Sequence, residues 1–222
     1  VDPLMTTLNM GDFAKFVSWS LGPLCGFTVQ PMVGYYSDRC RSRFGRRRPF
    51  IVVGGIFTAI GILVLFLIKQ NADKLSQNAK TSILLITVGL TYVAINTIQG
   101  NARSIIGDIV PDEQQDLAFT ISSVLIGLGS IITNLIGGIA YFIDSKEYQD
   151  QSVTIILITC SIIIIVSLLI TVFSAKEQQF TGELEDTNVF KKLFKAITNM
   201  SKPMSRASLM LTISWVGFYS FL

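Results

Sequence analysis

The sequence predicts an all-α integral membrane protein, and three observations support this fold class. Half of the 222 residues are hydrophobic and only 15% are charged, with a mean hydropathy of +0.55. Soluble domains carry about 25% charged residues. The apolar residues form long uncharged blocks, such as 51–68 and 155–173. A block of about 18 such residues is long enough to cross a ~30 Å hydrocarbon core as a helix.

Composition also excludes several functional classes. The sequence has no histidine, and its three cysteines (Cys25, Cys40 and Cys160) form no CxxC pair, so no metal site is expected. Neither a GxGxxG nor a P-loop motif occurs, and no nucleophile–base pattern is visible. We therefore expect no cofactor and no enzymatic activity. We expect no nucleic-acid partner, because the dense arginine cluster lies between two apolar blocks, where membrane topology explains it.

Five apolar stretches reach the length of a complete transmembrane helix. Two prolines mark the ends of such stretches. Pro49 falls in the first turn of the second stretch, where its missing N–H costs nothing, and Pro111 stops the third stretch. The chain begins without a signal peptide and stops inside an apolar run that is too short to span, so both ends are expected to be cut. The five predicted spans cover residues 14–37, 49–68, 82–110, 117–143 and 153–173.

The loops predict the orientation. Residues 38–48 contain six arginines, and residues 174–206 contain six basic residues. Cytoplasmic loops carry excess Lys and Arg, and four spans separate these two loops, so both are expected in the cytoplasm. Within the second loop, residues 189–197 read as a short basic amphipathic helix on the inner leaflet; an ordinary solvated linker helix is the alternative.

Helical spacing places polar residues on one face of three predicted spans. Steps of three or four residues give the third span one stripe, the first span another and the fourth span a stripe of small and polar residues. The other two spans are almost wholly apolar. We expect a bundle around an aqueous cavity; the alternative is that these residues only hold helices together. The stripes are Tyr92, Asn96, Gln99 and Arg103; Trp19, Pro23, Gly26 and Gln30; and Ser123, Gly127, Ser130, Asn134 and Gly138.

Arg103 is the most informative residue in these stripes. It lies seven residues before Val110, which is about 10 Å from the helix end at ~1.5 Å per residue. An arginine at that depth costs a few kcal/mol unless it snorkels to the interface, finds a partner or faces water. Snorkelling is one interpretation. The other is a polar cavity in which the guanidinium donates its fork of N–H groups to substrate oxygens.

The segment 38–48 reads DRCRSRFGRRR and follows Gly34. This G-x-x-x-D-R and G-R-R-R pattern resembles the loop 2–3 signature of the major facilitator superfamily. Residues 29–54 resemble the plant-type sucrose transporters more closely, as do Trp19 with Gly22 and Pro23, and the stretch from Asn96 through Arg103 to Asp108.

The resemblance implies the N-terminal six-helix bundle of a major facilitator fold, with the five complete spans as helices two to six of twelve. Residues 1–13 would be the tail of the first helix and an outer loop. Residues 174–206 would be the central cytoplasmic loop, and residues 207–222 the start of the seventh helix. The C-terminal half of the same polypeptide is then an implied partner.

The implied function is transport of sucrose or a related glycoside by alternating access. The implied sites fall into two groups, with Asp108 expected to pair with the arginine-rich loop. The substrate-binding candidates are Arg103, Asn96, Gln99, Gln30, Trp19 and Tyr92. The conformational motif consists of Gly34, Asp38, Arg39, Gly45, Arg46, Arg47, Arg48 and Asp108.

Two positions depart from the family pattern. The aspartate tied to proton coupling is replaced by Tyr92, and the family's histidine falls on Asp12. Proton symport, sugar uniport and a transport-inactive membrane sensor or scaffold, with 174–206 as its signalling segment, therefore stay open. The expected partners are a small sugar, protons in the case of symport, and the lipid bilayer, with the plasma membrane favoured over vacuolar or other internal membranes.

Overall fold

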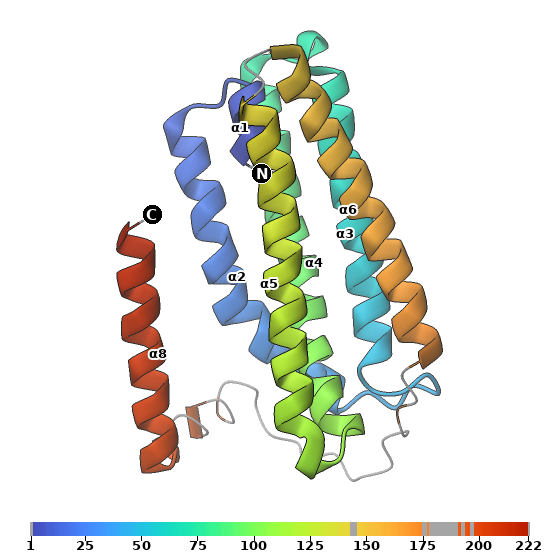
Figure 1. The fold of residues 1–222 in the computed structure, drawn as a ribbon, viewed down its shortest axis with the longest axis vertical. Helices are drawn as coiled ribbons and strands as arrows, with labels where there is room; N and C mark the ends of the chain where they lie inside the picture. Colours follow the sequence, from blue (N-terminus) through green and yellow to red (C-terminus); the bar gives the residue numbers. More distant parts are fainter. Residues whose placement is uncertain are drawn as a thin grey trace. The chain divides into compact units, whose positions relative to one another are not determined.

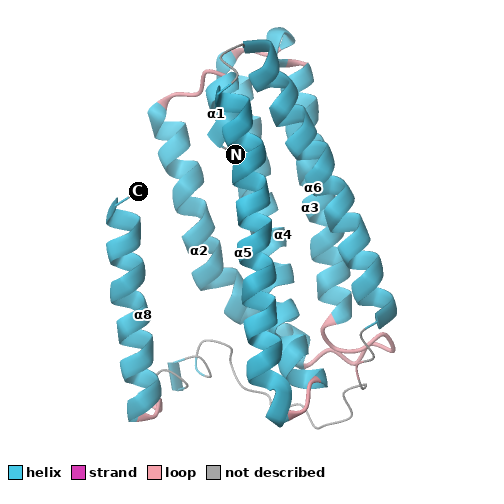
Figure 2. Ribbon diagram, viewed as in Figure 1, coloured by secondary structure: helices cyan, strands magenta, loops and turns pink. Residues whose placement is uncertain are grey.

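The computed structural model of this chain describes residues 2–142, 146–174, 177, 191, 194–195 and 198–221. The chain divides into two compact units, Val1–Gly182 and Glu183–Leu222. The described residues form helices joined by short loops, with no strand among them (Figures 1 and 2), which confirms the all-α class. The first unit contains α1 (Asp2–Thr7), α2 (Asp12–Asp38), α3 (Arg48–Gln70), the 3₁₀ turn η1 (Ala72–Lys74), α4 (Gln77–Ile109), α5 (Asp112–Phe142) and α6 (Lys146–Ser174). The second unit contains α8 (Lys202–Phe221).

Most helices begin earlier than the predicted spans, because polar residues extend them beyond the apolar stretch. The helix α4 starts at Gln77, where the Ser76 hydroxyl accepts a hydrogen bond from the backbone N–H of Ala79, a standard N-cap. The helix α5 starts directly after Pro111 with Asp112 and Glu113 in its first turn, where acidic side chains favour the positive end of the helix dipole.

Four described helical segments are long and apolar enough to cross a membrane: Arg48–Gln70, Gln77–Ile109, Asp112–Leu135 and Val153–Ser174. The first predicted span, 14–37, is not among them. It forms a continuous helix, α2, but polar residues and two prolines, Pro23 and Pro31, lower its apolar character. Its assignment as a membrane span stays a prediction.

The helix α4 packs against both α2 and α3, and α6 packs on the other side of α3. Glycines allow the close approach of α3 to its neighbours. A Cβ atom at Gly54 would lie 3.0 Å from the carbonyl oxygen of Ala94 on α4, and one at Gly61 would collide with Thr91. On the α6 side, a Cβ at Gly55 would collide with Leu168.

The main apolar core lies where α1 meets the ends of α3, α4 and α6. The side chain of Met5 is 0% exposed, and Leu4 and Leu8 are buried beside it against Leu84 and Val88 of α4. This end of the first unit is opposite the loop that joins α2 to α3 (Figure 1). We call the end with residues 38–48 the inner end and the end with α1 the outer end.

One region of the sequence analysis falls largely outside the described residues: most of the predicted amphipathic segment 189–197. The final predicted element, 207–222, begins five residues earlier than expected, because α8 starts at Lys202.

Candidate functional site

The polar stripes predicted for the first and third spans face each other across the α2–α4 contact. The two helices run in the same direction, from the outer to the inner end (Figure 1). A Cβ atom at Gly22 would lie 3.4 Å from the Tyr92 ring, and one at Gly26 would lie 3.5 Å from the Asn96 Oδ1 atom. Absence of a side chain on α2 therefore makes room for Tyr92 and Asn96 on α4.

Two predicted substrate ligands are bonded to each other here. The Gln30 Nε2 atom donates to Asn96 Oδ1 over 2.8 Å, and Asn96 Nδ2 donates to the carbonyl oxygen of Tyr92 over 2.9 Å. Asn96 is buried. Both sides of its amide are therefore satisfied within the protein, so a ligand would have to exchange with Gln30 to reach it.

Three other predicted ligands, Trp19, Gln99 and Arg103, are exposed. Gln99 and Arg103 are one helical turn apart on α4 and point to the same side. Among the described residues, neither side chain makes a hydrogen bond or ion pair. Their polar atoms are thus available to a ligand, whereas those of Gln30 and Asn96 are occupied.

The structure separates Trp19 from Arg103. Because Gly22 lies beside Tyr92 and Leu21 beside Gly89, Trp19 is level with about residue 89 of α4. Arg103 lies about 20 Å further along the same helix at ~1.5 Å per residue. The two residues therefore lie at different levels of the bundle. Tyr92 and Trp19 form the outer group of candidates, and Gln99 and Arg103 form the inner group.

Arg47 is the centre of a charge network at the inner end. Its side chain is only 9% exposed and lies between two carboxylates. The Nη2 atom is 2.6 Å from Asp38 Oδ1, and Nε is 3.0 Å from Asp108 Oδ2. The Nη1 atom donates to Ser37 Oγ over 2.9 Å, and that hydroxyl donates to the carbonyl oxygen of Gly34. The network therefore joins the end of α2, the start of α3 and the end of α4.

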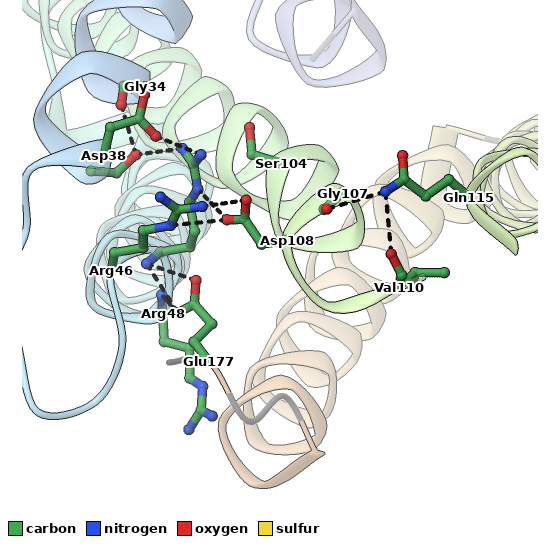
Figure 3. Close-up of polar contacts among 12 residues, drawn as sticks. Gly34, Asp38, Arg46, Arg48, Ser104, Gly107, Asp108, Val110, Gln115 and Glu177 are labelled. Carbon is green, nitrogen blue, oxygen red and sulfur yellow. Dashed lines mark hydrogen bonds and ion pairs between the residues drawn. The ribbon is translucent and has the colours of Figure 1, made fainter. Parts of the chain in front are cut away.

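Asp108 accepts from two arginines at once (Figure 3). Arg46 donates through Nε over 3.2 Å and through Nη2 over 2.5 Å. Arg47 donates through Nε to the Oδ2 atom over 3.0 Å. The bidentate contact is the geometry that a guanidinium and a carboxylate favour. The expected pairing of Asp108 with the arginine-rich loop is therefore present.

Glu177 was not predicted, and it completes the network from a position three residues after the end of α6. Its carboxylate accepts from the backbone N–H groups of Arg47 and Arg48 at 3.0–3.1 Å (Figure 3). These N–H groups open α3 and have no partner within the helix, and the positive end of the helix dipole favours the negative charge.

Gly45 is required beside this carboxylate. Its φ of +98° is in the left-handed region that favours glycine, and an added Cβ would collide with Glu177. Sequence spacing could not have revealed the contact, because Glu177 is 130 residues from Arg47. The glycine inside the arginine cluster was the only available signal.

The remaining residues of the predicted motif make different contacts. The Arg39 guanidinium lies 3.5 Å from the centre of the Tyr35 ring, a cation–π arrangement. Arg48 donates through Nη1 to the carbonyl oxygen of Val172 on α6. The motif therefore connects α2, α3, α4 and α6, and Arg47 is its buried arginine.

Comparison with known proteins gives the family. Residues 4–222 match the profile of the Major Facilitator Superfamily. The chain belongs to this superfamily. Together with the apolar helices, this makes the protein a multi-pass integral membrane protein, and the helices of the first unit are part of a major facilitator bundle.

Several curated relatives within the superfamily are sugar carriers. The chain is 26% identical to "Sucrose transport protein SUT5" of Oryza sativa, covering 100% of the chain and 46% of that protein. It is 26% identical to the "General alpha-glucoside permease" of Schizosaccharomyces pombe (99% and 41%). It is 32% identical to "Sucrose transport protein SUC3" of Arabidopsis thaliana (59% and 24%). The chain spans less than half the length of these relatives, which are transporters rather than enzymes.

Proposed function

We propose that the protein transports sucrose or a related glycoside across a membrane by alternating access. The observation that carries this proposal is the Gln99–Arg103 pair, which is exposed on α4 and has no partner among the described residues. The chain is similar over its whole length to a sucrose transport protein, and this supports the choice of a sugar. The second half of the carrier would come from the remainder of the same polypeptide.

The inner group would form the main sugar site. The Arg103 guanidinium presents several N–H donors in a fixed plane, which suits two neighbouring sugar hydroxyls. The Gln99 amide adds both a donor and an acceptor. Gln30 and Asn96, one turn further out, could exchange their mutual hydrogen bond for bonds to the sugar. Trp19 and Tyr92 would contact the sugar at an earlier, outer position, since aromatic faces can pack on a sugar ring.

The Arg47 network would hold the inner ends of the helices together in one state of the cycle. Ion pairs and bidentate hydrogen bonds depend strongly on geometry, so a tilt of α4 relative to α2 would break several at once. A cycle between two bundle arrangements needs contacts of this kind, which exist in one state and are absent in the other.

Sugar uniport is a second candidate, and Tyr92 favours it. Tyrosine carries no carboxylate, so it does not supply the proton-exchanging group that an aspartate would supply at this position. Proton symport would then need a coupling carboxylate elsewhere in the polypeptide. We expect the plasma membrane as the location.

Uptake of radiolabelled sucrose by cells that express the complete gene tests the proposal. We expect saturable uptake above that of cells without the gene, and competition by unlabelled α-glucosides. A correctly inserted protein that accumulates at the cell surface and takes up no labelled sugar would contradict transport and favour a sensor or scaffold.

A further inference from the structure

A groove lies on the surface formed by α3 and α6, away from both the inner network and the α2–α4 stripe. Its volume is about 320 Å³, at the lower end of the range typical for ligand pockets. Several of its lining side chains, including Leu63, Ile158 and Ile165, are about half exposed. The lining includes Ile62, Leu63 and Phe66 of α3 and Ile158, Ile162 and Ile165 of α6.

Contacts between the two helices close the groove at both ends. Toward the inner end, α3 and α6 approach closely at Gly55, where a Cβ atom would collide with Leu168. Toward the outer end, the Lys69 Nζ atom donates to Thr154 Oγ1 over 2.5 Å. From residue 154 to residue 168, α6 rises about 20 Å. The groove is therefore enclosed lengthwise and opens sideways.

The lining defines the chemistry of the occupant. It is apolar apart from Ser161, whose hydroxyl already donates to the carbonyl oxygen of Leu157 over 2.9 Å. An apolar cavity does not hold water, and an empty one loses dispersion contacts along its walls. Both α3 and α6 are long and apolar enough to cross a membrane, so the sideways opening faces hydrocarbon. A hydrocarbon chain from the bilayer fits these conditions.

Lys69 gives the site a polar end. It lies seven residues after Ile62, on the same face of α3 and close to that helix's C-terminus. A lysine at a helix end places its ammonium group at headgroup level while its stem stays in the apolar region. Because α3 begins at the arginine-rich loop, which is expected in the cytoplasm, Lys69 lies on the outer side of the membrane.

We propose that this groove binds one phospholipid of the outer leaflet. One acyl chain lies along Ile62, Phe66 and Ile162, and the phosphate lies near Lys69. This inference rests on the membrane assignment and is independent of the proposed sugar transport.

Native mass spectrometry of the purified chain, in detergent supplemented with palmitoyl-oleoyl phosphatidylglycerol, tests the site. We expect a lipid-bound species with one phospholipid per chain. Ile162→Trp fills the groove and should lower the bound fraction by about tenfold, since each displaced methylene contact contributes to tail binding. Ile163→Trp is the matched control: both isoleucines are 56% exposed, yet Ile163 does not line the groove. It should retain the lipid.

A second pair of variants covers the case in which a tryptophan prevents folding. Ser161→Leu adds bulk to the lining of the groove and should also lower lipid retention, whereas Ser167→Leu, on the exposed surface of α6, should not. Equal lipid retention by a groove variant and its control would overturn the proposal. The same spectra could also show a dimer of the chain. If both groove-filling substitutions dissociate that dimer, the groove binds a second copy of this chain, and the proposal is overturned.

Discussion

Arg47 and Arg103 are arginines of the same bundle in opposite situations. Arg47 is buried among Asp38, Asp108 and Ser37, whereas Arg103 is exposed and has no partner among the described residues. A buried arginine that pairs with two carboxylates stabilises the fold, because its donors are bonded to other residues of the chain. An exposed arginine in a polar stripe retains its donors for a ligand. Substitutions at the two residues should therefore affect different quantities: stability at Arg47, and sugar binding at Arg103.

The largest effect is expected from Arg47→Gln. Removing this charge leaves Asp38 without its partner in this network and leaves Asp108 paired with Arg46 alone. Breaking a buried ion pair costs about 3–5 kcal/mol, and we expect the lower end of this range because the Asp38 side chain is 53% exposed. Thermal unfolding of the purified chain in detergent measures the loss. The control is Arg43→Gln, since Arg43 is exposed in the same loop and should change stability little. Similar melting temperatures for both variants would contradict the structural role of Arg47.

Gly45→Ala should have the next largest effect on stability. It forces a non-glycine residue into the left-handed region, which costs about 1–3 kcal/mol, and its Cβ would displace the Glu177 carboxylate. Gly107→Ala is the matched control, because Gly107 is helical and an added Cβ meets nothing within 4 Å. We expect it to be neutral or slightly stabilising. A neutral Gly45→Ala would show that Glu177 does not need to approach this turn.

A smaller effect is expected at the α2–α4 contact. Gln30→Leu removes the donor to Asn96, and interhelical hydrogen bonds in membrane proteins contribute about 0.6 kcal/mol on average and at most about 1.7 kcal/mol. Thermal unfolding of Gln30→Leu, Asn96→Leu and the double variant measures the coupling between the two side chains. Strictly additive losses would show that the 2.8 Å bond contributes nothing to stability, and would leave both residues as candidates for sugar binding alone.

The smallest effect is expected at Tyr92 and concerns pH. Without a carboxylate at this position, sugar uptake should depend little on external pH. Tyr92→Asp introduces a group with an ordinary pKa of about 3.9; it gains a proton as the pH falls, so its variant should take up more sugar at acidic than at neutral pH. Uptake by the native protein that rises steeply with acidity would contradict the uniport candidate and leave the sugar assignment unaffected.

Which features the sequence could predict depended on whether they follow from local spacing. The helical stripes on α2 and α4 do. The pairing of Asp108 with the arginine-rich loop follows instead from topology, because the order of the spans places both at the same end of the bundle. Spacing defines the face of a helix but not its partner. It therefore could not show that Gln30 and Asn96 are bonded to each other.

Long-range relations were not accessible in the same way. The relative height of two helices depends on their packing, so the separation of Trp19 from Arg103 along the bundle could not be inferred. Glu177 reaches Arg47 across 130 residues without any local pattern. The limits of the helices were also underestimated, because apolar content marks the part of a helix in the membrane, whereas caps such as Ser76 determine where it begins.

The most direct test of the sugar site is the kinetics of sucrose uptake by Arg103→Lys and Arg103→Ala in the complete protein, at equal abundance in the membrane. Lysine keeps the charge and can snorkel, but it lacks the planar fork that binds two oxygens at once. If Arg103 binds the sugar, both variants should raise KM strongly and to a similar extent, while Arg43→Gln leaves KM unchanged. Near-normal uptake by Arg103→Lys alongside failure of Arg103→Ala would instead show that Arg103 supplies only a positive charge at the membrane interface.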